Sequence, residues 1–145
     1  MGKIPEKWIL VDTAKLELYY CEHEFHQMAF PIGIGREDTP TPTGNYYVHS
    51  MVMNPQLAYR VDDDKFPIDM YGTRAMDLSI QVFDYDTWCW RNYSIHGTNE
   101  PDSIPGRCSH GCIRMKNEDI EVLYEHCEPD VCYDCLSERG VLWVE

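Results

Sequence analysis

The chain has 145 residues, 43% of them hydrophobic and 12% aromatic, which is enough apolar material to fold as one domain around a single core. Its 25 acidic and 12 basic residues give a formal net charge of −13. Nucleic-acid backbones and anionic membrane surfaces both need clustered Lys and Arg, so this charge argues against either as a partner.

The first residues, MGKIPEKWILVD, contain no export signal. A signal peptide needs an apolar run of about 7–15 residues, whereas the run here, Trp8 to Val11, ends at Asp12. The seven cysteines are an odd number, which a reducing compartment tolerates as free thiols. We therefore expect a cytoplasmic protein, with a periplasmic or cell-wall location as the alternative if the natural chain begins further upstream.

Short segments with strand character dominate the chain. Their alternation or β-rich composition predicts strands at residues 7–12, 15–20, 24–34, 45–50, 93–96 and 140–145. In the second of these, Leu16, Leu18 and Tyr20 share one face, and a hairpin at residues 12–14 joins it to the first. The prolines of residues 36–44 predict a loop.

Residues 51–92 show no clear periodicity and receive no assignment. The acidic run at residues 62–65 is predicted to be a solvated loop, since it lacks the alternate-position ligands of a calcium site.

One helix is predicted at residues 118–126. Ile120, Leu123 and Tyr124 are spaced to share one face of it. Asn117 is placed to act as its N-cap.

Residues 95–115, IHGTNEPDSIPGRCSHGCIRM, hold two of the six histidines and two of the seven cysteines. Cys108 and Cys112 have neither the Cys-x-x-Cys spacing of a zinc pair nor that of an easy local disulfide. Covalent catalysis fits better, with Cys112 as nucleophile and His96 arriving from a neighbouring strand as its base. Gly111 would allow a tight turn whose amide faces the substrate.

A Cys-x-x-Cys pair does occur further on, at Cys132 and Cys135, with His126 and Cys127 just upstream. A zinc or redox role there is the alternative to packed or idle thiols on a second short helix.

His96-Gly97-Thr98 followed by Ser109-His110-Gly111-Cys112-Ile113-Arg114-Met115 resembles the signature of the L,D-transpeptidase catalytic-domain family, whose members act on peptidoglycan stem peptides. The resemblance extends to PIGIG at 31–35, TPTG at 41–44 and YGTRAMDL at 71–78, and covers roughly residues 7–126 plus the last strand. This chain departs from the family in lacking an export signal and in its extra cysteines.

The resemblance implies a role for each matching residue. Cys112 would be the acylated nucleophile and His96 its general base, with the carbonyl of Gly97 holding the far imidazole nitrogen. His110 and the amides of Gly111 and Cys112 would stabilise the oxyanion and orient the substrate.

Arg114 and Ser109 are assigned to substrate binding. The guanidinium of Arg114 suits a substrate carboxylate, although pairing with an acidic side chain of this chain stays open. Ser109 can equally be a turn hydroxyl, and His110 a packed core histidine. Cys108 has no assigned role, but could react with Cys112 under oxidation.

The resemblance further implies a mainly β fold, a sandwich- or barrel-like mixed sheet with one or two short helices. Residues 1–145 would form a single catalytic domain, with a cysteine-bearing insertion at about 127–139. The site is expected at a strand end, beneath a loop from residues 51–92.

The implied reaction is cleavage of the L,D bond to the terminal D-amino acid of a peptidoglycan tetrapeptide, through a thioester on Cys112. The acyl group then passes to an amine or to water, and no metal or organic cofactor is expected. A strictly hydrolytic cytosolic L,D-carboxypeptidase that trims recycled muropeptides is one alternative. An inactive binding or zinc-carrying module on the same fold is another.

Overall fold

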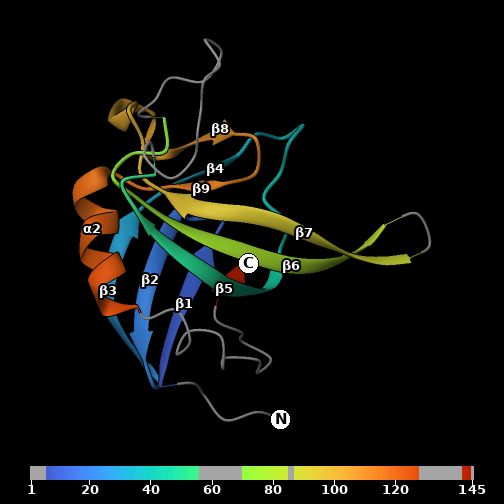
Figure 1. Cartoon of the computed structure of the whole chain (residues 1–145), viewed down its shortest axis with the longest axis horizontal. Helices are drawn as coiled ribbons and strands as arrows, with labels where there is room; N and C mark the ends of the chain where they lie inside the picture. The colour runs from blue at the N-terminus through green and yellow to red at the C-terminus, as the bar shows by residue number, and fades with distance from the viewer. Residues whose placement is uncertain (1–5, 56–69, 85–86, 128–141, 145) are drawn as a thin grey trace.

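The computed structural model describes residues 6–55, 70–84, 87–127 and 142–144. Within them, strands dominate and run in the spatial order β3-β2-β1-β10-β5-β6-β7-β9-β4-β8 (Figure 1). The strands are β1 (Lys7–Asp12), β2 (Glu17–Glu22), β3 (Phe25–Pro31), β4 (Gly33–Gly35), β5 (Gly44–Met53), β6 (Arg74–Asp84), β7 (Thr87–His96), β8 (Gly106–Ser109), β9 (Ile113–Arg114) and β10 (Leu142–Val144). The helices are the 3₁₀ turn η1 (Pro101–Ser103) and α2 (Asn117–His126).

Parallel and antiparallel pairs coexist, which confirms the predicted mainly β, mixed architecture. The β1–β10, β4–β8 and β7–β9 pairs are parallel, while β1–β2, β5–β6 and β6–β7 are antiparallel. None of the helices in the described ranges is long and apolar enough to cross a membrane.

The N-terminal hairpin forms as predicted, but its second strand begins two residues later than expected. The carboxylate of Asp12 accepts the amides of Ala14 and Lys15, and Leu16 sits at φ 56°, so the turn takes up residues assigned to the strand. Leu18 and Tyr20 are buried in the core, as the alternation predicts.

The predicted strand at 24–34 is two strands, β3 and β4. The amide of Ile32, between them, donates to the carbonyl of Leu16 at 3.1 Å, which interrupts the ladder. The interruption lets β4 leave the edge formed by β3 and pair instead with β8 and β9, next to the candidate site.

The segment left unassigned contains β6 and the first part of β7, and the predicted strand at 93–96 forms the end of β7. Their pairing is unbroken from Ala75 opposite His96 to Asp84 opposite Thr87. On one side of β6, Met76, Leu78 and Ile80 are buried in the core. The far end of the ribbon projects from the body of the molecule (Figure 1), which is why no single apolar alternation marks its whole length.

Helix α2 begins one residue before the predicted start and packs against β6. Ile120 and Leu123 are buried and Tyr124 packs partly against the same core, as predicted. The prediction of Asn117 as N-cap is wrong, because Lys116 holds that position and Asn117 is the first helical residue. The Asn117 side chain instead bonds backbone amides of two other segments.

The predicted closing strand forms as β10, in the middle of the sheet. It pairs in parallel with β1 and antiparallel with β5. The acidic run at 62–65, the proposed insertion at 127–139 beyond Cys127, and the pair Cys132 and Cys135 lie outside the described residues.

Candidate active site

A cavity of about 330 Å³ opens where β7 and β9 run side by side. Segments far apart in the sequence line it: Met70, Tyr71, His96, Ser109, His110, Cys112 and Arg114. The structure thus brings together the side chains predicted for catalysis and substrate binding. Met70, which sequence reasoning did not single out, and Tyr71, the first residue of the YGTRAMDL segment, come from the region expected to supply a covering loop.

His96 ends β7 and is almost fully enclosed, with 3% of its surface exposed. Its Nδ1 lies 2.5 Å from the carbonyl oxygen of Gly97. Because a carbonyl can only accept, Nδ1 carries the proton and Nε2 keeps its lone pair. Tyr71 packs edge-on against the imidazole, with ring centroids 4.9 Å apart.

Burial lowers the pKa of His96 to about 4, and the Arg114 guanidinium acts in the same direction. The Gly97 carbonyl and the Asp77 carboxylate oppose this lowering. At neutral pH the imidazole is therefore uncharged and able to accept a proton, as a general base must.

The strand end that carries His96 is fixed by a junction of Gly72, Gly97 and Asn117. The Oδ1 atom of Asn117 accepts the amides of Thr98 at 3.1 Å and Thr73 at 3.3 Å. A Cβ on Gly97 would lie 2.1 Å from that oxygen, and one on Gly72 would lie 2.2 Å from it. Only glycine permits this approach. The sequence marked Asn117 as a helix cap, and nothing in its local pattern pointed to this contact.

Cys112 follows a tight turn between β8 and β9. Gly111 adopts φ 122°, in the region that favours glycine, as expected. Ser109 Oγ donates to the carbonyl of Cys112 at 2.5 Å and accepts the amide of Gly111 at 3.2 Å. Ser109 therefore acts as a turn hydroxyl in this structure. With the Gly111 amide engaged, the Cys112 amide and His110 remain as candidates to bind an oxyanion.

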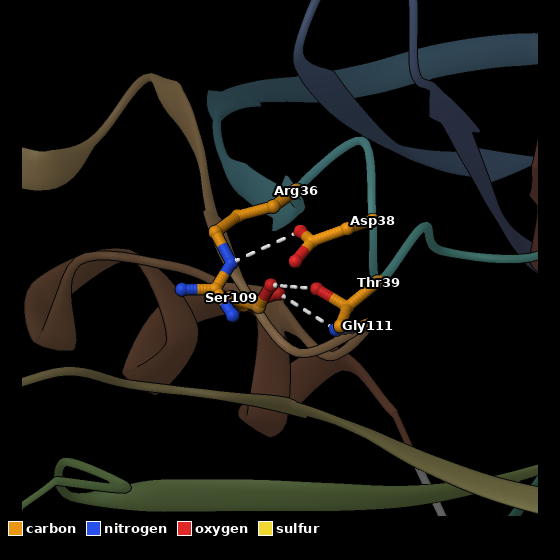
Figure 2. Close-up of polar contacts among 5 residues, drawn as sticks. All are labelled: Arg36, Asp38, Thr39, Ser109 and Gly111. Atoms are coloured by element: carbon orange, nitrogen blue, oxygen red, sulfur yellow. Dashed lines mark hydrogen bonds and ion pairs between the residues drawn. The ribbon is translucent and has the colours of Figure 1, made fainter.

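The loop at residues 36–44 holds this turn from the other side. Thr41 Oγ1 donates to the carbonyl of Gly111 at 2.8 Å and accepts the amide of Gly35 at 2.9 Å. Thr39 Oγ1 donates to the carbonyl of Ser109 at 2.9 Å (Figure 2). Sequence reasoning assigned neither threonine a role, although the TPTG segment was part of the family resemblance.

The same loop carries the ion pair between Arg36 and Asp38, 3.4 Å apart and exposed to solvent (Figure 2). An exposed pair of this kind contributes little to stability. The backbone amide of Arg36 helps to hold the turn that precedes Cys112, because it donates a hydrogen bond to the carbonyl of Ser109 at 3.0 Å.

The thiol of Cys112 is also held in its neutral form. Burial raises its pKa, while the backbone amide of Ser94 and the Arg114 guanidinium lower it and Asp77 raises it further. The resting site is thus a thiol beside a neutral imidazole.

Arg114 presents its guanidinium to the cavity. Its Nε is buried with no hydrogen-bond partner among the described residues, and its Nη1 lies 3.6 Å from Cys108 Sγ. The alternative of an ion pair finds no support in the described ranges, where no carboxylate pairs with Arg114. Cys108, whose role the sequence left open, lies against this guanidinium. His110 is exposed, so the alternative of a packed core histidine is wrong.

Within the part of the chain that the structure describes, no group of three or more His, Cys, Asp or Glu residues could hold a metal ion. The suggested zinc pair, Cys132 and Cys135, lies outside that part.

Cys112 and His96 line one cavity at a strand end, which is the arrangement that a nucleophilic cysteine and its base require. The chain belongs to the L,D-transpeptidase family: the family model of the YkuD L,D-transpeptidase catalytic domain matches residues 6–132. This confirms the resemblance seen in the motifs.

Two curated relatives illustrate the similarity. The chain is 30% identical over 129 residues to the probable L,D-transpeptidase YbiS of Escherichia coli (strain K12), which covers 81% of this chain and 40% of that protein. It is 35% identical over 91 residues to the putative L,D-transpeptidase YkuD of Bacillus subtilis (strain 168), covering 63% of this chain and 42% of that protein. The chain therefore spans less than half the length of these relatives.

Solved structures share the fold at lower identity. The Bdellovibrio bacteriovorus protein Bd1075 superposes with a TM-score of 0.61 at 24% identity, covering 88% of this chain and 46% of that one. The catalytic domain of the Enterococcus faecium L,D-transpeptidase gives 0.58 at 17% identity, covering 99% of this chain and 100% of that one.

Proposed function

We propose that this domain cleaves the L,D bond to the terminal D-amino acid of a peptidoglycan tetrapeptide and transfers the acyl group through a thioester on Cys112. The observation that carries the proposal is the shared cavity of Cys112 and His96, with the His96 tautomer fixed by Gly97. Family membership supports the substrate class.

In the first half-reaction, His96 Nε2 takes the thiol proton as Cys112 Sγ attacks the carbonyl carbon of the L-centre. The imidazolium then gives that proton to the departing amine, the C–N bond breaks, and a thioester remains. Because burial disfavours both charges, the thiolate and imidazolium form together, as a pair, only when substrate is attacked. We propose that the amide of Cys112 and the side chain of His110 stabilise the oxyanion.

In the second half-reaction, an amine or a water molecule attacks the thioester. His96 accepts its proton and returns it to the sulfur, which restores the thiol. An amine gives a cross-linked product, whereas water gives the trimmed peptide of an L,D-carboxypeptidase. Arg114, whose Nε lacks a partner in the described structure, is proposed to bind a substrate carboxylate.

Mass spectrometry of the protein with a tetrapeptide, with and without an amine acceptor, tests the proposal. We expect an adduct on Cys112 that corresponds to loss of one D-amino acid, and a released product whose mass distinguishes hydrolysis from transfer. Cys112→Ala should lower D-amino acid release by at least about a thousandfold.

Cys89→Ala is the matched control, since Cys89 is a free cysteine on β7 that does not line the cavity. Release by Cys112→Ala at the wild-type rate would refute the nucleophile assignment. Zinc retained through purification, with no adduct on Cys112, would favour an inactive module instead.

A further inference from the structure

The β6–β7 ribbon has two chemically different sides. Side chains directly opposite each other in an antiparallel pair, and those two positions apart on one strand, share a side. One side buries apolar residues in the core. His96 belongs to the other side, which it shares with Ser94 and with Asp77, the residue opposite Ser94.

This second side carries a row of hydrogen-bonding groups that leads away from the cavity. The Asp77 carboxylate accepts the hydroxyls of Ser94 at 2.9 Å and Ser50 at 2.6 Å. One pair further out, the hydroxyl of Ser79 donates to Asn92 Oδ1 at 3.1 Å. These bonds show that β5, β6 and β7 present their polar side chains to a common surface beside the catalytic base.

The same alternation along β7 places Trp90 and Trp88 next on this side. Both are exposed, at 57% and 66% of their surface. From His96 to Trp88 the strand rises through eight residues, or about 26 Å. Both tryptophans lie near the start of β7. That end of the β6–β7 ribbon projects from the body of the molecule (Figure 1).

We propose that this side of the ribbon binds the glycan strand to which the stem peptide is attached, so that the enzyme acts on peptide carried by a sugar chain. The inference rests on the proposed function, because His96 at the end of the row must receive the peptide. Sugar rings present flat C–H faces to aromatic side chains, and their hydroxyl and acetamido groups exchange hydrogen bonds with Ser, Asn and Asp.

The composition of the row favours a sugar chain over other occupants. Exposed tryptophans alone would also suit a membrane, but a chain with net charge −13 is repelled by an anionic surface. A second copy of the chain would bury an apolar patch, whereas carboxylate, hydroxyl and amide groups separate the tryptophans from the cavity. The sugar backbone of peptidoglycan is largely uncharged, so the acidic protein does not repel it. A span of about 26 Å accommodates several sugar rings.

Binding of peptide-free glycan strands provides a test that does not depend on catalysis. We expect the wild-type protein to bind such strands and Trp88→Ala/Trp90→Ala to bind them at least about tenfold more weakly. Phe25→Ala is the matched control, because Phe25 is an equally exposed aromatic residue (68%) on β3, which five strands separate from β7. It should bind like the wild type.

Kinetics separate this inference from the proposed function. The double variant should form the Cys112 adduct with free tetrapeptide at the wild-type rate, while its KM for glycan-linked tetrapeptide rises about tenfold with kcat little changed. Adduct formation without any effect of the tryptophans on glycan binding would overturn the inference alone. Failure of the wild type to form the adduct would overturn the proposed function. A dimer, or vesicle binding, that the double variant abolishes while glycan binding persists would also refute the inference.

Discussion

Burial favours the neutral forms of the Cys112 thiol and the His96 imidazole, the two groups proposed to react. The pKa of the first is raised and that of the second is lowered, so a resting ion pair is disfavoured from both sides. The Arg114 guanidinium stabilises the thiolate and disfavours the imidazolium, and Asp77 does the reverse. In the proposed reaction, charge would therefore separate only during attack.

Alkylation of Cys112 should report this resting state. Only the thiolate reacts, and a raised pKa shifts its formation to higher pH, so the alkylation rate should reach its midpoint above the value of about 8.5 for free cysteine. Iodoacetamide labelling followed by peptide mass spectrometry across pH 6–10 measures it. His96→Gln should leave that midpoint nearly unchanged. A plateau below pH 8 in the wild type would indicate a resting thiolate–imidazolium pair.

The buried His96 should also make the fold sensitive to acid. Its pKa is about 4 in the folded protein, against 6.5 for an unperturbed histidine, so between these limits the unfolded chain binds more protons. The contribution of the neutral imidazole is fully present above pH 6.5 and is lost as pH falls toward 4, by at most about 3 kcal/mol.

Urea unfolding of the wild type and His96→Gln at several pH values between 4 and 7 measures this sensitivity. The free energy of unfolding should fall more steeply with acid in the wild type than in the variant. Parallel slopes for the two proteins would contradict the burial argument.

At the scale of elements, the site depends on where three segments meet. The end of β7, the segment before β6 and the start of α2 join at Gly97, Gly72 and Asn117. Two backbone amides end on one side-chain oxygen, so the first helical residue fixes the strand end that carries His96. The helix therefore positions this strand end in addition to contributing apolar side chains to the core.

Asn117→Ala should leave the amides of Thr73 and Thr98 without that acceptor. We expect a loss of about 1–3 kcal/mol in the free energy of unfolding and about a tenfold slower adduct formation at Cys112, because His96 would be misplaced. Denaturant melts and timed mass spectrometry measure the two effects.

Two controls sharpen that result. Asn117→Asp keeps an acceptor oxygen and should retain most of both properties, and Glu125→Ala, at an exposed position of α2, should match the wild type. Equal behaviour of the Asn117→Ala and Asn117→Asp variants would show that the acceptor oxygen is not what matters.

At the scale of the whole molecule, the last strand joins the first part of the sheet to the rest. β10 pairs with β1 on one side and with β5 on the other. Within the sheet, β10 therefore connects the N-terminal hairpin to the strands that carry the site.

Truncation of the chain before Leu142 should separate these two parts. Because β1 and β5 would both lose their partner in the middle of the sheet, we expect the melting temperature to fall by about 10 °C or more, or cooperative folding to be lost. Circular dichroism melts measure the effect. Deletion of Glu145 alone, just beyond β10, is the control, and a truncated protein that melts like the wild type would rule out this role of β10.

The sequence by itself determined what could be read from local pattern and from motif. A short β-rich segment located β1, alternating residues located the buried face of β2, and helical spacing located α2. The Cys–His motif located most of the residues that line the cavity. The strands and the helix could be predicted because their patterns depend on neighbours within a few positions. The site residues could be predicted because their motif resembles that of a known family.

Tertiary structure decided the rest. Only the end of the long β6–β7 ribbon, residues 93–96, was predicted from the sequence. The rest received no assignment because the two sides and the two ends of the ribbon face different surroundings, so no single period describes it. Asn117 and Thr41 gained their roles only from amides and carbonyls brought close by folding. The neutral resting state of Cys112 and His96 likewise depends on burial, which a linear pattern does not contain. The sequence specifies which chemical groups are present. Their removal from water and their long-range hydrogen-bond partners arise only when distant segments pack together.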